Sequence, residues 1–115
     1  MIDQVRIMSA NEYFRKYAQE GIGKGADRWM VRRQMLDDMK HEIFGMIALR
    51  TGGDAGKTPD TGDPEVLKVA KNVIKASTFK WKKICRMFDA YNETRNLIKP
   101  EDLKDILEIE EPKTE

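Results

Sequence analysis

The fold is decided by residues 63–91, which read DPEVLKVAKNVIKASTFKWKKICRMFDAY. Asp63 is a favourable N-cap residue and Pro64 suits the first helical position, so a helix is predicted to begin here. Apolar and small residues then recur every three or four positions, which places them on one side of a helix, as in a helix that packs in a bundle. This predicted apolar face consists of Val66, Ala70, Val73, Ser77, Trp81, Ile84, Phe88 and Tyr91. The pattern predicts one long amphipathic helix that ends near residue 92.

A second long helix is predicted over residues 27–50. At 100° per residue, one broad arc of this segment collects its large apolar side chains. They are Trp29, Met35, Leu36, Met39, Ile43, Met46 and Ile47. The opposite side collects Gln34, Asp37, Asp38, His41 and Gly45. We interpret the methionines as adaptable core residues, because Met fills irregular gaps between helices well.

Two short helices are predicted at the ends of the chain. Ser9 and Glu12 have the spacing of a capping box, and Met8 and Tyr13 can form a hydrophobic staple around it. Gly21 followed by Ile22 predicts a Schellman-type end of this first helix, after which Gly21–Gly25 reads as a flexible turn. Near the other end, Pro100 precedes a short fourth helix predicted from Glu101 to about Leu107.

These elements predict an all-α fold, a small helical bundle of two long antiparallel amphipathic helices covered by two short helices. We expect residues 1–108 to form a single helical domain with a flexible loop at 51–62, and residues 109–115 to form a disordered acidic tail. A chain of 115 residues leaves little room for a second domain. The core is expected to include Tyr13, Tyr17, Trp29 and Trp81.

The composition of the chain restricts where the protein is expected to be located. Its one cysteine, Cys85, excludes an internal disulfide. No apolar run approaches the ~20 residues that span a bilayer, and the first residues do not resemble a signal peptide, so we expect a cytoplasmic protein with no membrane partner. The net charge of +1 does not favour any class of partner. The distribution of the charges is more informative.

The basic stripe is the most informative feature for function. No acidic residue occurs between Glu65 and Asp89, and on a helical wheel most cations of this segment lie opposite the apolar face. We define the basic stripe as Lys68, Lys71, Lys75, Phe79, Lys82, Lys83 and Arg86. Like charges three or four residues apart repel one another on a helix. The stripe is therefore the predicted binding site for a polyanion or an acidic partner.

Three interpretations of the basic stripe remain open. It can be a solvated lysine face, since lysine is a good helix former. It can be neutralised within the same protein by acidic groups such as Asp37, Asp38 and Glu42, or by residues 108–115. It can also bind an external polyanion, either an acidic protein surface or the phosphates of a nucleic acid. Because the stripe is nearly all lysine, nucleic-acid binding would not read base sequence.

Two segments, residues 51–58 and residues 88–107, resemble known ligand-binding sites in outline. Residues 51–58 resemble a phosphate-binding loop, but Thr51 occupies the place of its first glycine and no strand precedes the loop. Residues 88–107 resemble an EF-hand in outline. The aliphatic position at Ile98 would place Tyr91 first, Arg95 fifth, Asn96 sixth and Asp102 twelfth, which is not a calcium ligand pattern. We predict neither a nucleotide site nor a calcium site.

The remaining candidates for chemistry have simpler structural interpretations. His41, the only histidine, is predicted to pair with Asp37 on an exposed helix face rather than to bind a metal. Cys85 lies at the border of the apolar face and is predicted to be a small buried residue. Arg28, Arg32 and Arg33 are predicted to serve structure, with Arg32 partly buried along its stem.

These observations predict a non-enzymatic small helical binding or adaptor protein that acts through surface contacts. No nucleophile–base pair or carboxylate pair can be named, and no metal, cofactor or small-molecule substrate is indicated. The alternative is a non-sequence-specific nucleic-acid-binding protein that uses the same basic helix. The expected partner is a protein, and a homodimer would complete the burial of the two long helices.

Overall fold

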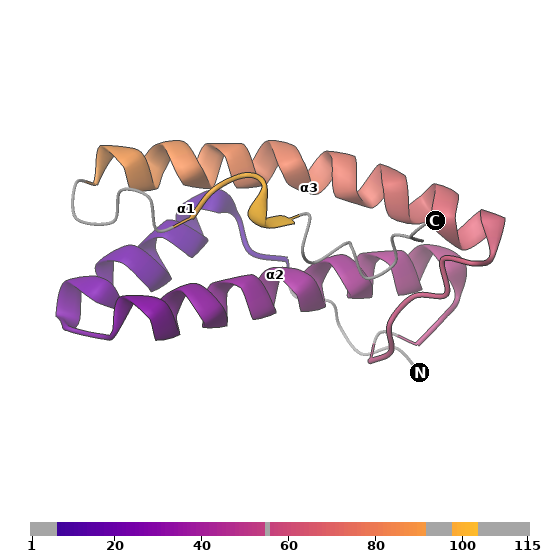
Figure 1. Cartoon of the computed structure of the whole chain (residues 1–115), viewed down its shortest axis with the longest axis horizontal. Coiled ribbons are helices and arrows are strands. Elements are labelled where there is room, and N and C mark those ends of the chain that lie inside the picture. Colours follow the sequence, from indigo (N-terminus) through magenta and orange to yellow (C-terminus); the bar gives the residue numbers. More distant parts are fainter. Residues whose placement is uncertain (1–6, 55, 92–97, 104–115) are drawn as a thin grey trace, which may run out of the picture.

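The structure is a computed structural model of the chain, which describes residues 7–54, 56–91 and 98–103 (Figure 1). Helix α1 (Ala10–Tyr13) continues into a π-helical turn (Phe14–Gln19), and a 3-10 turn follows at Ile22–Lys24. The long helices are α2 (Arg28–Thr51) and α3 (Pro64–Ala90). No strand occurs among the described residues. The predicted all-α class is confirmed, with a short bent N-terminal helix and two long helices.

Helices α2 and α3 lie side by side and run in opposite directions (Figure 1). Both begin where the sequence predicts. The side chain of Asp27 accepts a hydrogen bond of 2.8 Å from the Trp29 N–H, and that of Asp63 accepts one of 2.9 Å from the Glu65 N–H. These bonds satisfy amide groups that the first turn of a helix leaves without a partner. The segment between the helices is a loop, as predicted.

The N-terminal helix begins as predicted and ends differently. Ser9 and Glu12 form both hydrogen bonds of the capping box. Gly21, however, has a φ of −91° and does not end the helix in the left-handed conformation. That conformation occurs at Gly25, with a φ of 95°, where the Gly25 N–H bonds to the Ile22 carbonyl and the Ala26 N–H to the Gly21 carbonyl. The Schellman pattern is therefore present four residues later than predicted.

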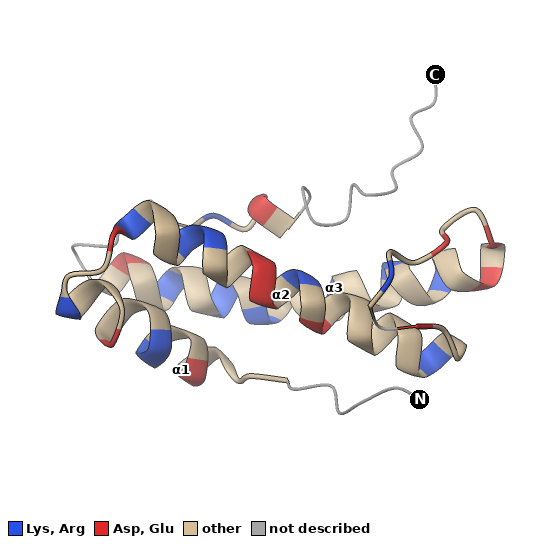
Figure 2. Ribbon diagram, turned by 90° about the horizontal axis from the view of Figure 1, so that it is seen from below, with Lys and Arg blue, Asp and Glu red and all other residues tan. Residues whose placement is uncertain are grey.

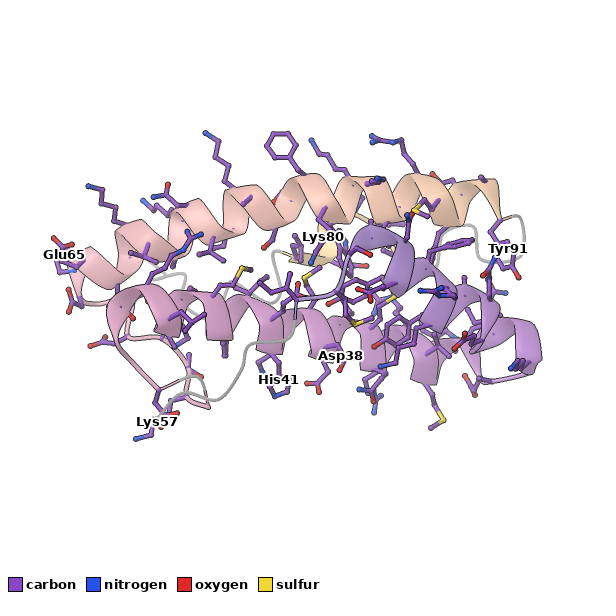
Figure 3. The ribbon with its side chains drawn as sticks, turned by 180° about the vertical axis from the view of Figure 1, so that it is seen from behind. Asp38, His41, Lys57, Glu65, Lys80 and Tyr91 are labelled. Carbon is purple, nitrogen blue, oxygen red and sulfur yellow. The ribbon has the colours of Figure 1, made fainter. Side chains whose placement is uncertain are left out.

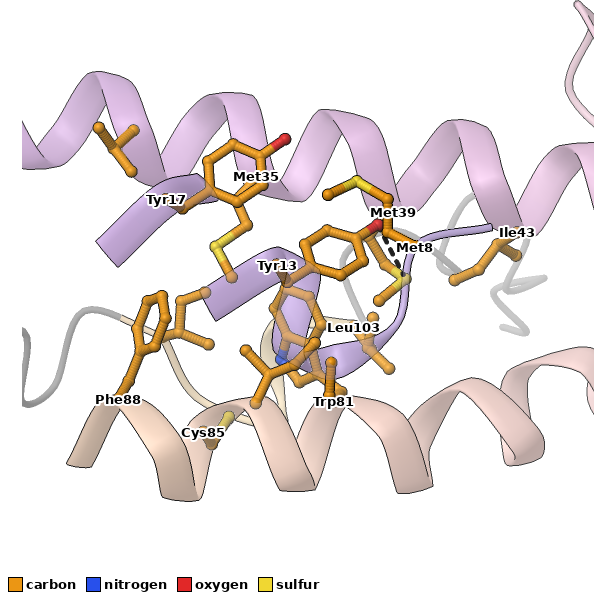
Figure 4. Close-up of a cluster of buried hydrophobic side chains, with 14 of the residues drawn as sticks. Met8, Tyr13, Tyr17, Met35, Met39, Ile43, Trp81, Cys85, Phe88 and Leu103 are labelled. Carbon is orange, nitrogen blue, oxygen red and sulfur yellow. Dashed lines mark hydrogen bonds between the residues drawn. The ribbon is translucent and has the colours of Figure 1, made fainter. Parts of the chain in front are cut away.

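The core lies where α1 and its π-helical extension pack between α2 and α3 (Figure 4). Tyr13 and Trp81 are fully buried at its centre, and the rings of Tyr13 and Tyr17 stack with centroids 5.8 Å apart. The Tyr13 hydroxyl contacts the Met39 sulfur at 4.0 Å. Three of the four aromatic residues predicted for the core are thus buried.

The prediction for the fourth aromatic residue, Trp29, is wrong. Its side chain is 73% exposed, and Gly45, predicted on the polar side, is buried. The wheel treats one arc as buried along the whole of α2. The buried arc is instead narrow at the start of the helix, around Val31 and Met35, and becomes wider after residue 41. Trp29 falls outside the narrow part and Gly45 falls inside the wide part.

Residues 98–103 pack against the long helices. The Trp81 indole N–H donates a hydrogen bond of 2.7 Å to the carbonyl of Lys99. Asp102 accepts one of 2.8 Å from Arg32 and one of 3.0 Å from the Lys99 N–H. Residues 100–101 form a turn and residues 102–103 are helical, while the rest of the predicted fourth helix and the predicted tail 109–115 lie outside the described residues.

Candidate functional site on α3

All seven residues of the basic stripe are exposed on α3. The rotation of the helix is set by the opposite side, where Val73, Trp81, Ile84 and Phe88 are buried. Figure 3 shows a row of side chains that projects from α3 on the side away from α2. Phe79 is 71% exposed near the middle of the stripe. The predicted stripe is therefore a continuous outer surface of about 27 Å from residue 68 to residue 86, at ~1.5 Å per residue.

The six cations of the basic stripe have no ion pair with any carboxylate of the described residues. Basic residues recur along α3, as Figure 2 shows. Acidic residues occur only near the ends of the helix, at Glu65 and Asp89. Phe79 leaves a gap in the row of charges, so cations flank an exposed aromatic ring on both sides. The surface is both strongly positive and locally apolar.

Lys80 has a different environment from these six cations. Its ammonium group lies 2.5 Å from Glu42 Oε1 and 2.7 Å from the carbonyl oxygen of Met8, and 5.3 Å from the centre of the Tyr13 ring. The other oxygen of Glu42 accepts a hydrogen bond of 2.6 Å from the Met8 N–H. The side chain of Glu42 is only 2% exposed. Lys80 and Glu42 thus form a buried ion pair that joins α2, α3 and the start of α1.

The acidic groups of α2 that were candidates to neutralise the basic stripe have other contacts. Glu42, expected on the surface, is buried against Lys80. Asp38 accepts hydrogen bonds from Tyr17 and Gln34 and lies 3.6 Å from Lys16. Asp37 lies 3.6 Å from His41. Neutralisation of the stripe by this group of acids is therefore contradicted, and the other candidate, residues 108–115, lies outside the described residues.

The buried Lys80–Glu42 pair was missed by sequence reasoning, although both residues lie at the edge of the apolar side of their helix. Glu42 lies beside Met35, just outside the edge of the predicted apolar arc of α2, where part of a side chain can be buried. Lys80 lies outside the basic stripe and next to buried Trp81. A buried carboxylate requires a partner of opposite charge. The two positions are therefore compatible with an ion pair between the long helices, but a wheel of each helix does not show that the two side chains meet.

The cysteine and the histidine have the environments predicted for them. Cys85 is buried, and burial raises the pKa of its thiol to about 12, so it remains protonated at neutral pH. His41 is exposed, and its Nδ1 lies 2.9 Å from the Asp37 carbonyl oxygen. No group of three His, Cys, Asp or Glu side chains in the described part of the chain is arranged to hold a metal ion.

The loop between α2 and α3 uses some of its amide groups internally. The Gly56 N–H donates to the Asp54 side chain at 2.8 Å, and the Gly62 N–H donates to the Asp60 side chain at 3.1 Å. A phosphate-binding loop needs successive free N–H groups directed at the ligand. Carboxylates that accept these bonds would also repel a phosphate. This arrangement does not favour an anion site in the loop.

Comparisons with known proteins do not indicate a function for this chain, so the surface of the molecule is the remaining evidence. No family model, no curated protein and no solved structure matches the chain. None of the helices in the described part of the chain combines the length and the apolar character needed to cross a membrane. The exposed side chains described above are therefore the features that bear on function.

Proposed function

We propose that this protein is a small, non-enzymatic adaptor that binds an acidic protein surface through the basic stripe of α3. The observation that supports this function is that the lysines and the arginine of α3 have two different environments. Lys80 is paired with a buried carboxylate, whereas six cations of the outer side have no carboxylate partner among the described residues. A partner of opposite charge would remove their mutual repulsion and increase the rate of encounter.

Phe79 indicates what the centre of the partner surface should contain. A phenyl ring that is 71% exposed among lysines gains little in the free protein. Burying it against apolar atoms of a partner contributes roughly 1.5–3 kcal/mol. Aromatic side chains are enriched at the centres of protein interfaces, with charged residues at the rim. We therefore expect the partner to have an apolar depression with carboxylates on both sides.

A second candidate function is binding to single-stranded nucleic acid without sequence preference. The same two observations favour it, because lysines contact phosphates and an exposed aromatic ring can stack on a base. The stripe contains no Asn or Gln and only one arginine, Arg86. Readout of base edges uses mainly those residue types. Only phosphate contact and stacking are expected.

The decisive experiment replaces Lys71, Lys75, Lys82 and Arg86 together with glutamine. A control variant replaces four exposed cations outside the stripe, Arg15, Lys24, Arg50 and Lys57, and so loses the same charge. Binding to polyglutamate and to single-stranded and duplex oligonucleotides is measured for both. We expect the stripe variant to lose binding by at least tenfold and the control to retain it. Equal losses, or no binding to any probe at low salt, would contradict the proposed function.

The salt dependence of binding distinguishes the two candidate functions. If all six cations contact phosphates of a single strand, a plot of the logarithm of the binding constant against the logarithm of salt concentration should have a slope of about −4. Each phosphate contact contributes ~0.7 to this slope. Replacement of Phe79 by alanine should then weaken oligonucleotide binding by roughly 1–3 kcal/mol. Preference for polyglutamate over oligonucleotides at equal salt would favour the acidic protein partner.

A further inference from the structure

The start of α2 carries a second exposed apolar surface. Trp29 is 73% exposed and Met30 is 69% exposed, and they are adjacent in the first turns of the helix. Arg33 lies four residues after Trp29 and three after Met30, so its side chain emerges between theirs. Trp, Met and Arg are among the residue types enriched in protein interfaces. This composition differs from that of the basic stripe.

This surface continues along α2 for about three turns. Exposed residues recur on the same side as far as His41, and Phe44, the next residue of this side, is buried. In Figure 3, His41 points away from α3. We define the α2 outer face as Trp29, Met30, Arg33, Asp37, Lys40 and His41. The α2 outer face and the basic stripe therefore lie on different sides of the molecule.

The charges of the α2 outer face are ordered along the helix. Arg33 has no ion pair with any carboxylate of the described residues. Asp37, one turn later, has its only ion pair there with the exposed His41, at 3.6 Å. A positive group is thus followed by a negative group, and the two are separated by four residues. A second helix of the same sequence, laid antiparallel, presents these charges in the reverse order.

The register of such a pair follows from the residue numbers. If a two-fold axis passes through the α2 outer face at the level of residue 35, Arg33 of each copy faces Asp37 of the other. In the same register Met30 faces Lys40 and Trp29 faces His41 of the second copy. In each copy, Met30 then covers the aliphatic part of Lys40 of the other copy, and Trp29 covers the imidazole ring of His41. A two-fold interface requires this kind of self-complementarity.

We propose that two copies of this chain associate through the α2 outer face, antiparallel, with Arg33 and Asp37 forming two symmetric ion pairs between the copies. This interface is independent of the basic stripe, which it leaves exposed. The contact covers about three helical turns, or ~18 Å of helix, which is short for an interface of standard size. The dimer is therefore expected to be in equilibrium with the monomer, and to dissociate on dilution.

Sedimentation over a wide concentration range tests the proposal with three charge-altered samples. Arg33→Glu and Asp37→Lys each turn both symmetric ion pairs into repulsive ones, so each variant should dimerise roughly tenfold or more weakly than the wild type. In an equimolar mixture of the two variants, the carboxylate introduced at position 33 of one copy faces the ammonium group introduced at position 37 of the other. The unaltered Asp37 and Arg33 of the same two copies also face each other. The mixture should therefore form a heterodimer with nearly wild-type affinity.

Apolar variants and a distant charge variant complete the experiment. Trp29→Ala and Met30→Ala should each weaken dimerisation, with about a tenfold loss expected for the tryptophan. Lys57→Glu, in the exposed loop, should leave it unchanged. The proposal is overturned by a strictly monomeric wild type at millimolar concentration, or by a mixture that does not recover. The glutamine variant of the basic stripe should dimerise normally, so the failure of one proposal can be separated from the failure of the other.

Discussion

Lys80 and Glu42, separated by 38 positions in the chain, form a buried ion pair whose nearest atoms are 2.5 Å apart. The carboxylate also accepts the Met8 N–H, and the ammonium group also donates to the Met8 carbonyl. Both polar groups of the Met8 backbone are thereby satisfied. The pair therefore connects the two long helices to the residue that precedes the capping box of α1.

Removing one member of this pair should destabilise the protein strongly. In Glu42→Gln the ammonium group of Lys80 loses its counter-charge, and in Lys80→Met the carboxylate of Glu42 is left alone. Because the Lys80 side chain is 19% exposed, we expect a loss of about 2–4 kcal/mol in each, somewhat below the full value for a buried pair. Urea unfolding measures both. The double variant should cost clearly less than the sum of the two.

Lys83→Met is the matched control for this pair. Lys83 is an exposed member of the basic stripe on the same helix, so its replacement should change the free energy of unfolding by less than about 0.5 kcal/mol. If the losses from Glu42→Gln and Lys80→Met were additive, the two side chains would be acting independently, and the pair would not be what joins the helices.

Periodicity predicted the long helices well because their signals are local. Asp27 and Asp63 supply caps, and the buried side of α3 follows the spacing of its apolar residues. The exposure of Trp29 could not be predicted in this way, since it depends on what packs against the first turn of α2. A wheel shows which residues share a side of a helix, but it does not show how much of that side another element covers.

The two glycines at the end of the N-terminal helix should fail for different reasons when replaced. A Cβ at Gly21 would lie 2.7 Å from the Tyr17 carbonyl oxygen, although its φ of −91° suits any residue. A Cβ at Gly25 would meet nothing within 4 Å, but its φ is +95°. Alanine should cost about 1–3 kcal/mol at Gly21 through the close contact and about 1–2 kcal/mol at Gly25 through backbone strain.

Asparagine distinguishes the two causes. Asn tolerates the left-handed conformation better than Ala, so Gly25→Asn should recover part of the stability that Gly25→Ala loses. Gly21→Asn should be at least as damaging as Gly21→Ala, because its Cβ meets the same carbonyl oxygen. Thermal unfolding of the four variants measures this difference. Recovery at Gly21 rather than at Gly25 would contradict the assignment of the Schellman turn to residue 25.

Cys85 should resist alkylation in the folded protein. Its thiol is buried, with a pKa raised to about 12 mainly by desolvation, so little thiolate exists at pH 8. Iodoacetamide should react about a hundredfold or more slowly than with the unfolded chain. Equal rates in buffer and in denaturant would show that the thiol is accessible.

The same pKa gives a stability prediction with a definite sign. The unfolded chain loses the thiol proton near its ordinary pKa of 9.0, while the folded protein retains it to about 12. The free energy of unfolding should therefore decrease as the pH rises through this interval. Cys85→Ala lacks this contribution, so its difference from the wild type should change most between those two pH values. A difference that stays constant over the interval would argue against the burial of the thiol.

The basic stripe is the part of the function that the sequence could indicate, because a one-sided distribution of lysines on α3 is visible on a wheel. The wheel could not show which cations were already paired. Glu42 was expected to be a surface acid, yet it contacts Lys80 in the core. The distinction between a structural lysine and the six cations of the stripe depends on tertiary contacts 38 positions apart in the chain.

Neutralising the basic stripe should not weaken the fold, which separates its binding role from a structural one. Replacing Lys71, Lys75, Lys82 and Arg86 with glutamine removes the like-charged pairs that these residues form at i,i+3 or i,i+4. Four such pairs are removed, each costing roughly 0.2–0.5 kcal/mol, so the variant should be about 1–2 kcal/mol more stable at low salt. The gain should diminish at ~1 M salt, where the Debye length is about 3 Å. Urea midpoints at the two salt concentrations measure it, and a variant less stable than the wild type at low salt would mean that these cations have carboxylate partners within their own chain.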